Sequence, residues 1–95
     1  MEILLTDNEI IQAIQEYPEH NFIQVETWEW PDYELRLVIQ VTKTDPGKLQ
    51  EHLTLYVCSL CTDNEDASVI KKYGRRITQK IRRKFPQSEV HSDLR

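Results

Sequence analysis

Cysteine is scarce in this sequence, with only Cys58 and Cys61 among 95 residues. Small secreted domains usually depend on several disulfides, so this count excludes that class and favours a reducing compartment. A zinc site needs four ligands, and the three histidines stand at spacings that no compact zinc motif uses. A redox role is the remaining alternative, but a redox CxxC opens its helix, whereas Thr62 follows this one. We therefore interpret both cysteines as buried structural residues and expect neither a metal nor a cofactor.

Glycine is equally scarce, with two residues, and the sequence has no glycine-rich phosphate loop, HExxH motif or serine elbow. No pair of carboxylates is marked as catalytic by a neighbouring histidine. Apolar runs stay far below the roughly 20 residues that span a bilayer, and Met1–Leu5 is too short and too acidic for a signal peptide. We expect a protein that is not an enzyme, is cytoplasmic and does not bind membranes.

The chain has enough apolar material for one modest core, because 39% of its residues are hydrophobic. No solenoid-like repeat divides it. We predict a single α+β domain over residues 1–86 and a flexible C-terminal tail over residues 87–95. A chain of this length buries only about 60–65% of its unfolded surface, so a partner or a second copy would add stability.

Two copies of the tetrapeptide Thr-Asp-Asn-Glu predict two helix starts. In each copy the threonine caps the helix and the glutamate three positions later returns a hydrogen bond, which is the capping-box arrangement. The first copy begins at Thr6 and predicts a helix over about 7–17. The second begins at Thr62 and predicts a helix over about 63–85. A proline follows each segment and ends it.

Between these helices the apolar residues recur with a period of two, which is typical of strands. Three strands are predicted, over 22–30, 33–43 and 49–60, with turns at Pro31 and at 45–47 between them. Short turns between consecutive strands favour antiparallel pairing. The predicted fold is therefore αβββα, a three-stranded antiparallel sheet with two helices packed on one face.

The formal net charge of −4 hides a separation of charge along the chain. Residues 1–66 hold 14 of the 16 Asp and Glu but only 3 of the 12 Lys and Arg. Residues 67–95 hold the other 2 acidic and 9 basic residues. An acidic body with a basic end points to an anionic partner or to an acidic protein surface.

The second predicted helix concentrates the positive charge, since eight of the 14 residues from Lys71 to Lys84 are Lys or Arg and none is acidic. Closely spaced cations gain affinity for nucleic acid by counterion release, and arginine forks match phosphate oxygens. We predict that six residues bind nucleic acid or a nucleic-acid machine: Lys71, Lys72, Arg75, Arg76, Arg82 and Arg83. An acidic protein surface and an ordinary solvated face are the alternatives.

The sheet face that the helices leave open collects apolar and aromatic side chains. The patch consists of Trp28, Trp30, Val38 and Tyr56, and strand alternation places Cys58 beside it. Neighbouring carboxylates oppose phosphate there, so we interpret the patch as a protein interface, with a homodimer as the first possibility. Base stacking and packing under a loop are alternatives. The rival functional hypothesis is therefore a protein-binding adaptor or inhibitor that uses the acidic body and the open sheet face.

Overall fold

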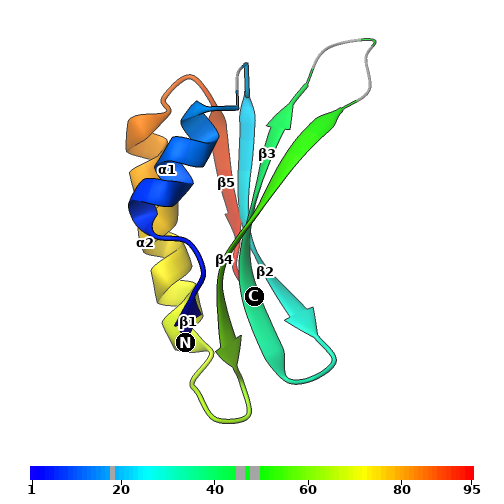
Figure 1. The fold of residues 1–95 in the computed structure, drawn as a ribbon, viewed down its shortest axis with the longest axis vertical. Helices are drawn as coiled ribbons and strands as arrows, with labels where there is room; N and C mark the ends of the chain where they lie inside the picture. Colours follow the sequence, from blue (N-terminus) through cyan, green and yellow to red (C-terminus); the bar gives the residue numbers. More distant parts are fainter. Residues whose placement is uncertain (18, 45–46, 48–49) are drawn as a thin grey trace.

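The computed structural model describes residues 1–95 except 18, 45–46 and 48–49. Within these residues the elements follow the order of Figure 1. Their bounds are β1 Glu2–Ile3, α1 Asp7–Gln15, β2 Phe22–Trp30, β3 Glu34–Lys43, β4 Glu51–Cys61, α2 Ser68–Lys84 and β5 Glu89–Asp93. No helix in the described part of the chain is long and apolar enough to cross a membrane. The α+β class and the presence of two helices are as predicted.

The strands form one mixed sheet in the order β1-β4-β3-β2-β5, and both helices lie on the same side of it (Figure 1). β2, β3 and β4 pair antiparallel as predicted, whereas β5 pairs parallel with β2. The prediction of three strands is therefore incomplete. β1 has only two residues, too few to show a period, and β5 has a single apolar residue, Val90. The segment 87–95, predicted to be a tail, thus adds an edge strand.

The first helix begins as the sequence predicts. Thr6 Oγ1 accepts a hydrogen bond from the Glu9 amide at 3.3 Å, and Glu9 Oε1 accepts one from the Thr6 amide at 3.0 Å. These reciprocal bonds satisfy two amides that the helix itself leaves without partners. Ile10 and Ile14 then turn toward the sheet and are buried.

The second copy of the tetrapeptide does not start a helix, so the prediction of a capping box at Thr62 is wrong. The amide and the hydroxyl of Thr62 both donate to the Tyr33 carbonyl, at 2.7 and 2.8 Å. Thr62 therefore joins the end of β4 to the turn between β2 and β3 instead of capping a helix. α2 begins later, at Ser68, whose amide donates to Asp66 Oδ1 at 2.9 Å. The contact between Thr62 and Tyr33, which are distant in sequence, thus takes the place of the local helix cap that the sequence predicts.

A β-bulge in β4 changes which side chains face the helices. The register pairs Leu37 with Cys58 but Val38 with Tyr56, so Val57 is an extra residue on β4. The Val57 carbonyl accepts hydrogen bonds from two amides of the segment between β1 and α1. Because of the bulge, Cys58 lies in the helix-facing core with no exposed surface. The prediction that it lies on the open face is wrong, since simple alternation cannot reveal an inserted residue.

The core lies between the sheet and the two helices. Its fully buried side chains include Ile10, Ile14, Ile23, Val25, Leu37, Ile39, Ile70, Ile77 and Ile81. Gly74 brings α2 close to the sheet, because a Cβ at this position would lie 3.0 Å from Leu37 Cδ1 and 2.9 Å from Leu94 Cδ2. The helix that carries the basic residues therefore packs closely against the sheet.

Candidate polyanion-binding surface

The basic helix α2 contacts other elements on three sides. Its apolar face covers the sheet, one flank contacts α1, and the other flank contacts β5 (Figure 1). A strip of its surface is left to solvent. The position of each cation around the helix decides whether it contacts the rest of the chain or faces outward.

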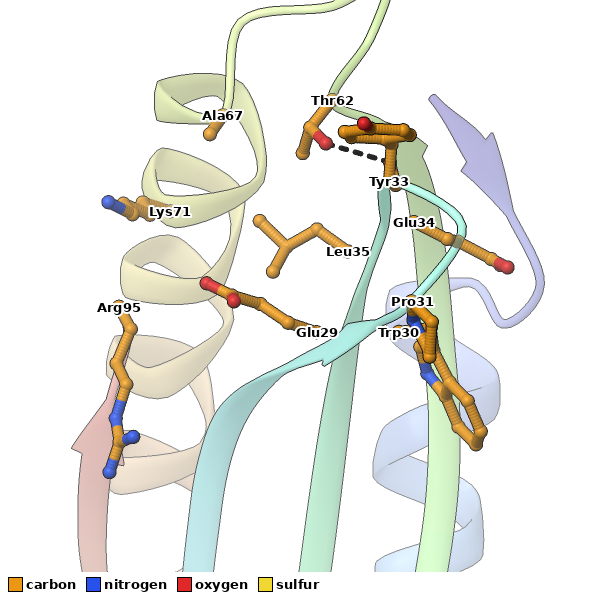
Figure 2. Close-up of a pocket in the computed structure, with 10 residues that line it drawn as sticks. All are labelled: Glu29, Trp30, Pro31, Tyr33, Glu34, Leu35, Thr62, Ala67, Lys71 and Arg95. Atoms are coloured by element: carbon orange, nitrogen blue, oxygen red, sulfur yellow. Dashed lines mark hydrogen bonds between the residues drawn. The ribbon is translucent and has the colours of Figure 1, made fainter.

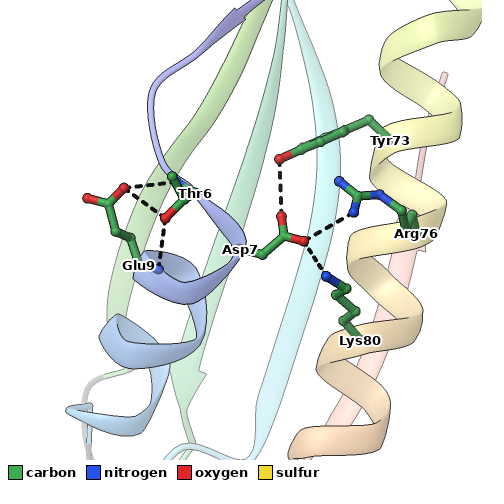
Figure 3. A network of polar contacts seen from close by, with 6 residues as sticks. All are labelled: Thr6, Asp7, Glu9, Tyr73, Arg76 and Lys80. Carbon is green, nitrogen blue, oxygen red and sulfur yellow. Dashed lines mark hydrogen bonds and ion pairs between the residues drawn. The ribbon is translucent and has the colours of Figure 1, made fainter.

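On the α1 flank, the Asp7 carboxylate gathers three donors from α2 (Figure 3). The Tyr73 hydroxyl donates to Oδ1 at 3.2 Å, and Arg76 Nη1 donates to Oδ2 at 3.2 Å. Lys80 Nζ forms a hydrogen bond and an ion pair with Oδ2. The Lys80 contact above all, with both positive charges, lowers the pKa of Asp7 although burial opposes this. Asp7 therefore neutralises part of the charge on α2.

The Tyr73 side chain is the neutral member of this group. Burial, and then the neighbouring Asp7 charge, raise the pKa of its hydroxyl, so it remains a donor at neutral pH. The guanidinium of Arg76 lies over the Tyr73 ring at 4.8 Å from the centroid, which adds a cation–π contact to its ion pair. Arg76, one of the predicted binding residues, is thus held in place by two partners within the chain.

On the β5 flank, Arg82 is also engaged. Its Nε and Nη2 atoms donate to the Val90 carbonyl at 3.3 and 3.1 Å, which ties α2 to the edge strand. The Arg82 side chain is still solvent-exposed and keeps its charge. Arg82 therefore contributes positive potential beside the strip, with its position fixed by the β5 backbone.

Between the flanks lie Lys72, Arg75 and Arg83, which we call the free strip. All three are exposed, and within the described part of the chain none of them has a hydrogen bond or an ion pair. Lys72 and Arg83 are 11 positions apart, which is about 16 Å along the helix axis. α2 carries no acidic residue that would neutralise them. Lys84 is a further exposed cation in the last turn that the six-residue prediction omits, although it belongs to the same basic run.

Lys71, the remaining predicted residue, lies apart from the free strip. It is half-buried and lines a pocket of about 350 Å³ between the β2–β3 hairpin and the first turns of α2 (Figure 2). In this view Glu29 extends from β2 toward α2 beside Leu35, while the Trp30 ring points away from the cavity. The lining mixes one inward carboxylate with the cations Lys71 and Arg95. This mixed charge distinguishes the pocket from the purely positive strip.

The apolar and aromatic patch lies on the opposite side of the sheet. Val38 has no exposed surface, whereas Trp30 and Tyr56 are 42% and 41% exposed. The Trp28 and Tyr56 rings meet edge to face at 6.2 Å, and the Arg36 guanidinium lies 4.9 Å from the Trp30 centroid. Val38 is therefore already buried within the chain, and the three aromatic rings are what the patch offers to a partner.

Carboxylates surround this patch. Trp28 Nε1 donates to Glu26 Oε2 at 3.2 Å, and Arg36 Nε donates to Glu34 Oε1 at 2.9 Å. The strand registers place four carboxylates on the open face: Glu26, Glu34, Glu89 and Asp93. The two sides of the sheet therefore differ in charge, with carboxylates on the open face and a positive strip on α2.

The two cysteines differ in environment. Cys58 is buried, and desolvation raises the pKa of its thiol to about 11, so it is protonated at neutral pH. Cys61 is exposed at the end of β4, so the prediction that both cysteines are buried is correct only for Cys58. Within the part of the chain that the structure describes, no cluster of three His, Cys, Asp or Glu residues is placed to hold a metal ion.

No family model matches this chain, and no curated protein or solved structure is significantly similar to it. The geometry and charge of the surfaces described above are therefore what points to a function.

Proposed function

We propose that this protein is a small, non-enzymatic accessory protein that binds nucleic acid through the free strip of α2. The observation that carries the proposal is the set of three exposed cations, Lys72, Arg75 and Arg83, that form no hydrogen bond or ion pair with the described residues. The chain neutralises Arg76 and Lys80 with Asp7, yet forms no ion pair with the strip among the described residues, and only the Asp66 charge acts on Lys72 without direct contact. A polyanion would supply the missing negative charge.

The energetics of the helix support this interpretation. Like charges three or four residues apart destabilise a helix by about 0.2–0.5 kcal/mol per pair. An ordinary solvated helix mixes in glutamate and avoids this cost, whereas α2 pairs Lys72 with Arg76 and Lys80 with Lys84. A row of phosphates removes the repulsion and releases condensed counterions at the same time. The negative open face is unsuited to phosphate, which leaves α2 as the contact surface.

The salt dependence of binding tests the proposal. Three or four contacted phosphates, matching the free strip with or without Lys84, give a slope of about −2.7 to −3.6 for log affinity against log salt on duplex DNA. Fluorescence anisotropy with mixed-sequence duplex DNA, single-stranded DNA and RNA at two salt concentrations measures this slope. Absence of binding to all three at about 50 mM salt would exclude the proposal, because electrostatic contacts are strongest there.

Two double variants at Arg75 and Arg83 separate charge from other effects. Arg75→Gln with Arg83→Gln removes two cations, so the slope should become shallower by about 1.8. Arg75→Lys with Arg83→Lys keeps both charges and serves as the matched control, with a nearly unchanged slope. Equal slopes for the two variants would show that these residues do not contact phosphate.

A second candidate function is a protein-binding adaptor or inhibitor that works through the open sheet face. The exposure of Trp30 and Tyr56 favours it, since clustered exposed aromatic rings mark protein interfaces. A homodimer through this face would cover both rings. Light scattering on the wild-type chain and on Trp30→Ser with Tyr56→Ser tests it: a mass near 11 kDa for the wild type at high micromolar concentration excludes the dimer.

A further inference from the structure

The groove between α1 and the C-terminal half of α2 holds an open depression of about 280 Å³. Four residues line it: Ile11 from α1, and Lys80, Arg83 and Lys84 from α2. None of them is acidic. Arg83 and Lys84 are exposed and, within the described residues, neither forms a hydrogen bond or an ion pair. The depression is therefore a positively charged recess with a half-buried apolar side chain in its wall.

The same groove already binds an anionic group about one turn away. The Asp7 carboxylate sits between α1 and α2, bonded to Tyr73, Arg76 and Lys80 (Figure 3). Lys80 belongs both to this carboxylate site and to the depression. The groove thus shows, within the chain itself, that cations on this edge of α2 converge on an oxyanion placed against α1.

We infer that the depression is a discrete site for one phosphate group of the nucleic-acid backbone. The inference rests on the proposed function. It identifies the point on α2 where side chains bind a phosphate by direct contact rather than by long-range attraction alone. Arg83 offers a fork that matches two phosphate oxygens, while Lys80 and Lys84 supply point charges. Ile11 gives the adjoining sugar an apolar surface, so the recess fits a sugar–phosphate unit better than a bare ion.

The local charges favour an anion even at the end of a helix. The last carbonyls of α2 carry roughly half a negative charge, which by itself disfavours phosphate. Lys80, Arg83 and Lys84 oppose this with three positive charges, of which Asp7 offsets one. The remaining net charge at the recess is positive.

Titration with inorganic pyrophosphate tests the site without nucleic acid. The expected result is a set of NMR shift changes centred on the Ile11 methyl groups and the last turn of α2. Arg83→Gln with Lys84→Gln should weaken this binding about tenfold or more, as the loss of charge-assisted hydrogen bonds does. Lys72→Gln with Arg75→Gln removes the same amount of charge from outside the recess. This variant should change the affinity for pyrophosphate about twofold or less. Equal losses in the two variants, or shifts spread along the whole helix, would overturn the inference.

The same variants distinguish failure of the site from failure of the proposed function. If pyrophosphate binds in the recess but no nucleic acid binds at about 50 mM salt, the phosphate site stands and the proposed function is wrong. If duplex DNA binds and the two double variants weaken it equally, the proposed function stands and the discrete site is wrong. All four substituted residues are exposed, so circular dichroism should show unchanged folding for both variants.

Discussion

Replacing Asp7 with asparagine removes the charge that joins α1 to α2 while keeping the shape of the side chain. Asp7 is only 23% exposed, but its partners Arg76 and Lys80 are 51% and 46% exposed. Both cations keep much of their hydration, so each ion pair stabilises the fold about as much as an exposed surface pair does. That contribution is about 0.2–1 kcal/mol. The negative charge in the first turn of α1 adds about 0.3–1 kcal/mol.

The sum for Asp7→Asn is a loss of about 0.7–3 kcal/mol in the free energy of unfolding at pH 7. For a domain of this size it corresponds to a fall in Tm of about 3–24 °C. Urea denaturation followed by tryptophan fluorescence measures the change. Asp63→Asn is the matched control: Asp63 is exposed and has no hydrogen bond or ion pair among the described residues.

The pH dependence gives the sharper test. The pKa of Asp7 is lowered from its ordinary value of 3.8, so its contribution is present above the unfolded pKa and is lost as pH falls through the lower folded pKa. The difference in free energy of unfolding between wild type and Asp7→Asn should therefore be largest at pH 7 and should disappear below about pH 4. A gap that stays constant down to about pH 2 would show that the carboxylate charge does not hold the two helices together.

Three further outcomes follow from the core and the caps. In the native protein one thiol per chain, Cys61, should react with an aromatic disulfide reagent at neutral pH, and Cys58 should react only on unfolding. Gly74→Ala should lower the free energy of unfolding by about 1–3 kcal/mol in a urea titration, because the methyl group meets Leu side chains at close range. Thr6→Ala should cost about 1 kcal/mol and reduce helix content by circular dichroism, whereas Thr62→Ala should leave helix content unchanged.

The parts of the fold that were predicted correctly are those whose signals are local. The period of two in β2 and β3, and the capping box at Thr6, lie within a few residues of the chain. β5 could not be predicted, because backbone pairing with the edge of β2 needs no apolar pattern. The bulge at Val57 also lacks a sequence signal, since its carbonyl is bonded by the chain after β1, more than 50 residues earlier. The prediction of a helix cap at Thr62 was wrong for the same reason, because its hydrogen-bond partner Tyr33 is 29 residues away.

For the candidate site, the sequence predicted the helix and its charge but not how the cations divide among partners. The periodicity of α2 could place Arg76 and Arg82 on the solvent side, yet only the positions of α1 and β5 show that Asp7 and the Val90 carbonyl engage them. The same limitation applies to Val38, which alternation assigns to the open face while only its neighbours decide that it is covered. Charge and period are properties of one segment, whereas pairing depends on segments distant in the chain.

The opposite charges on the two sides of the sheet make the molecule a permanent electric dipole. α2 lies on one side of the sheet (Figure 1), and the strand registers place the carboxylates of the open face on the other. In the field of a long polyanion this dipole experiences a torque that turns α2 toward the polymer before any contact forms. Arrival in the right orientation shortens the rotational search that limits most association rates. Because the field is screened beyond about 10 Å at 0.1 M salt, added salt should slow the association that we propose as well as weaken its final contact.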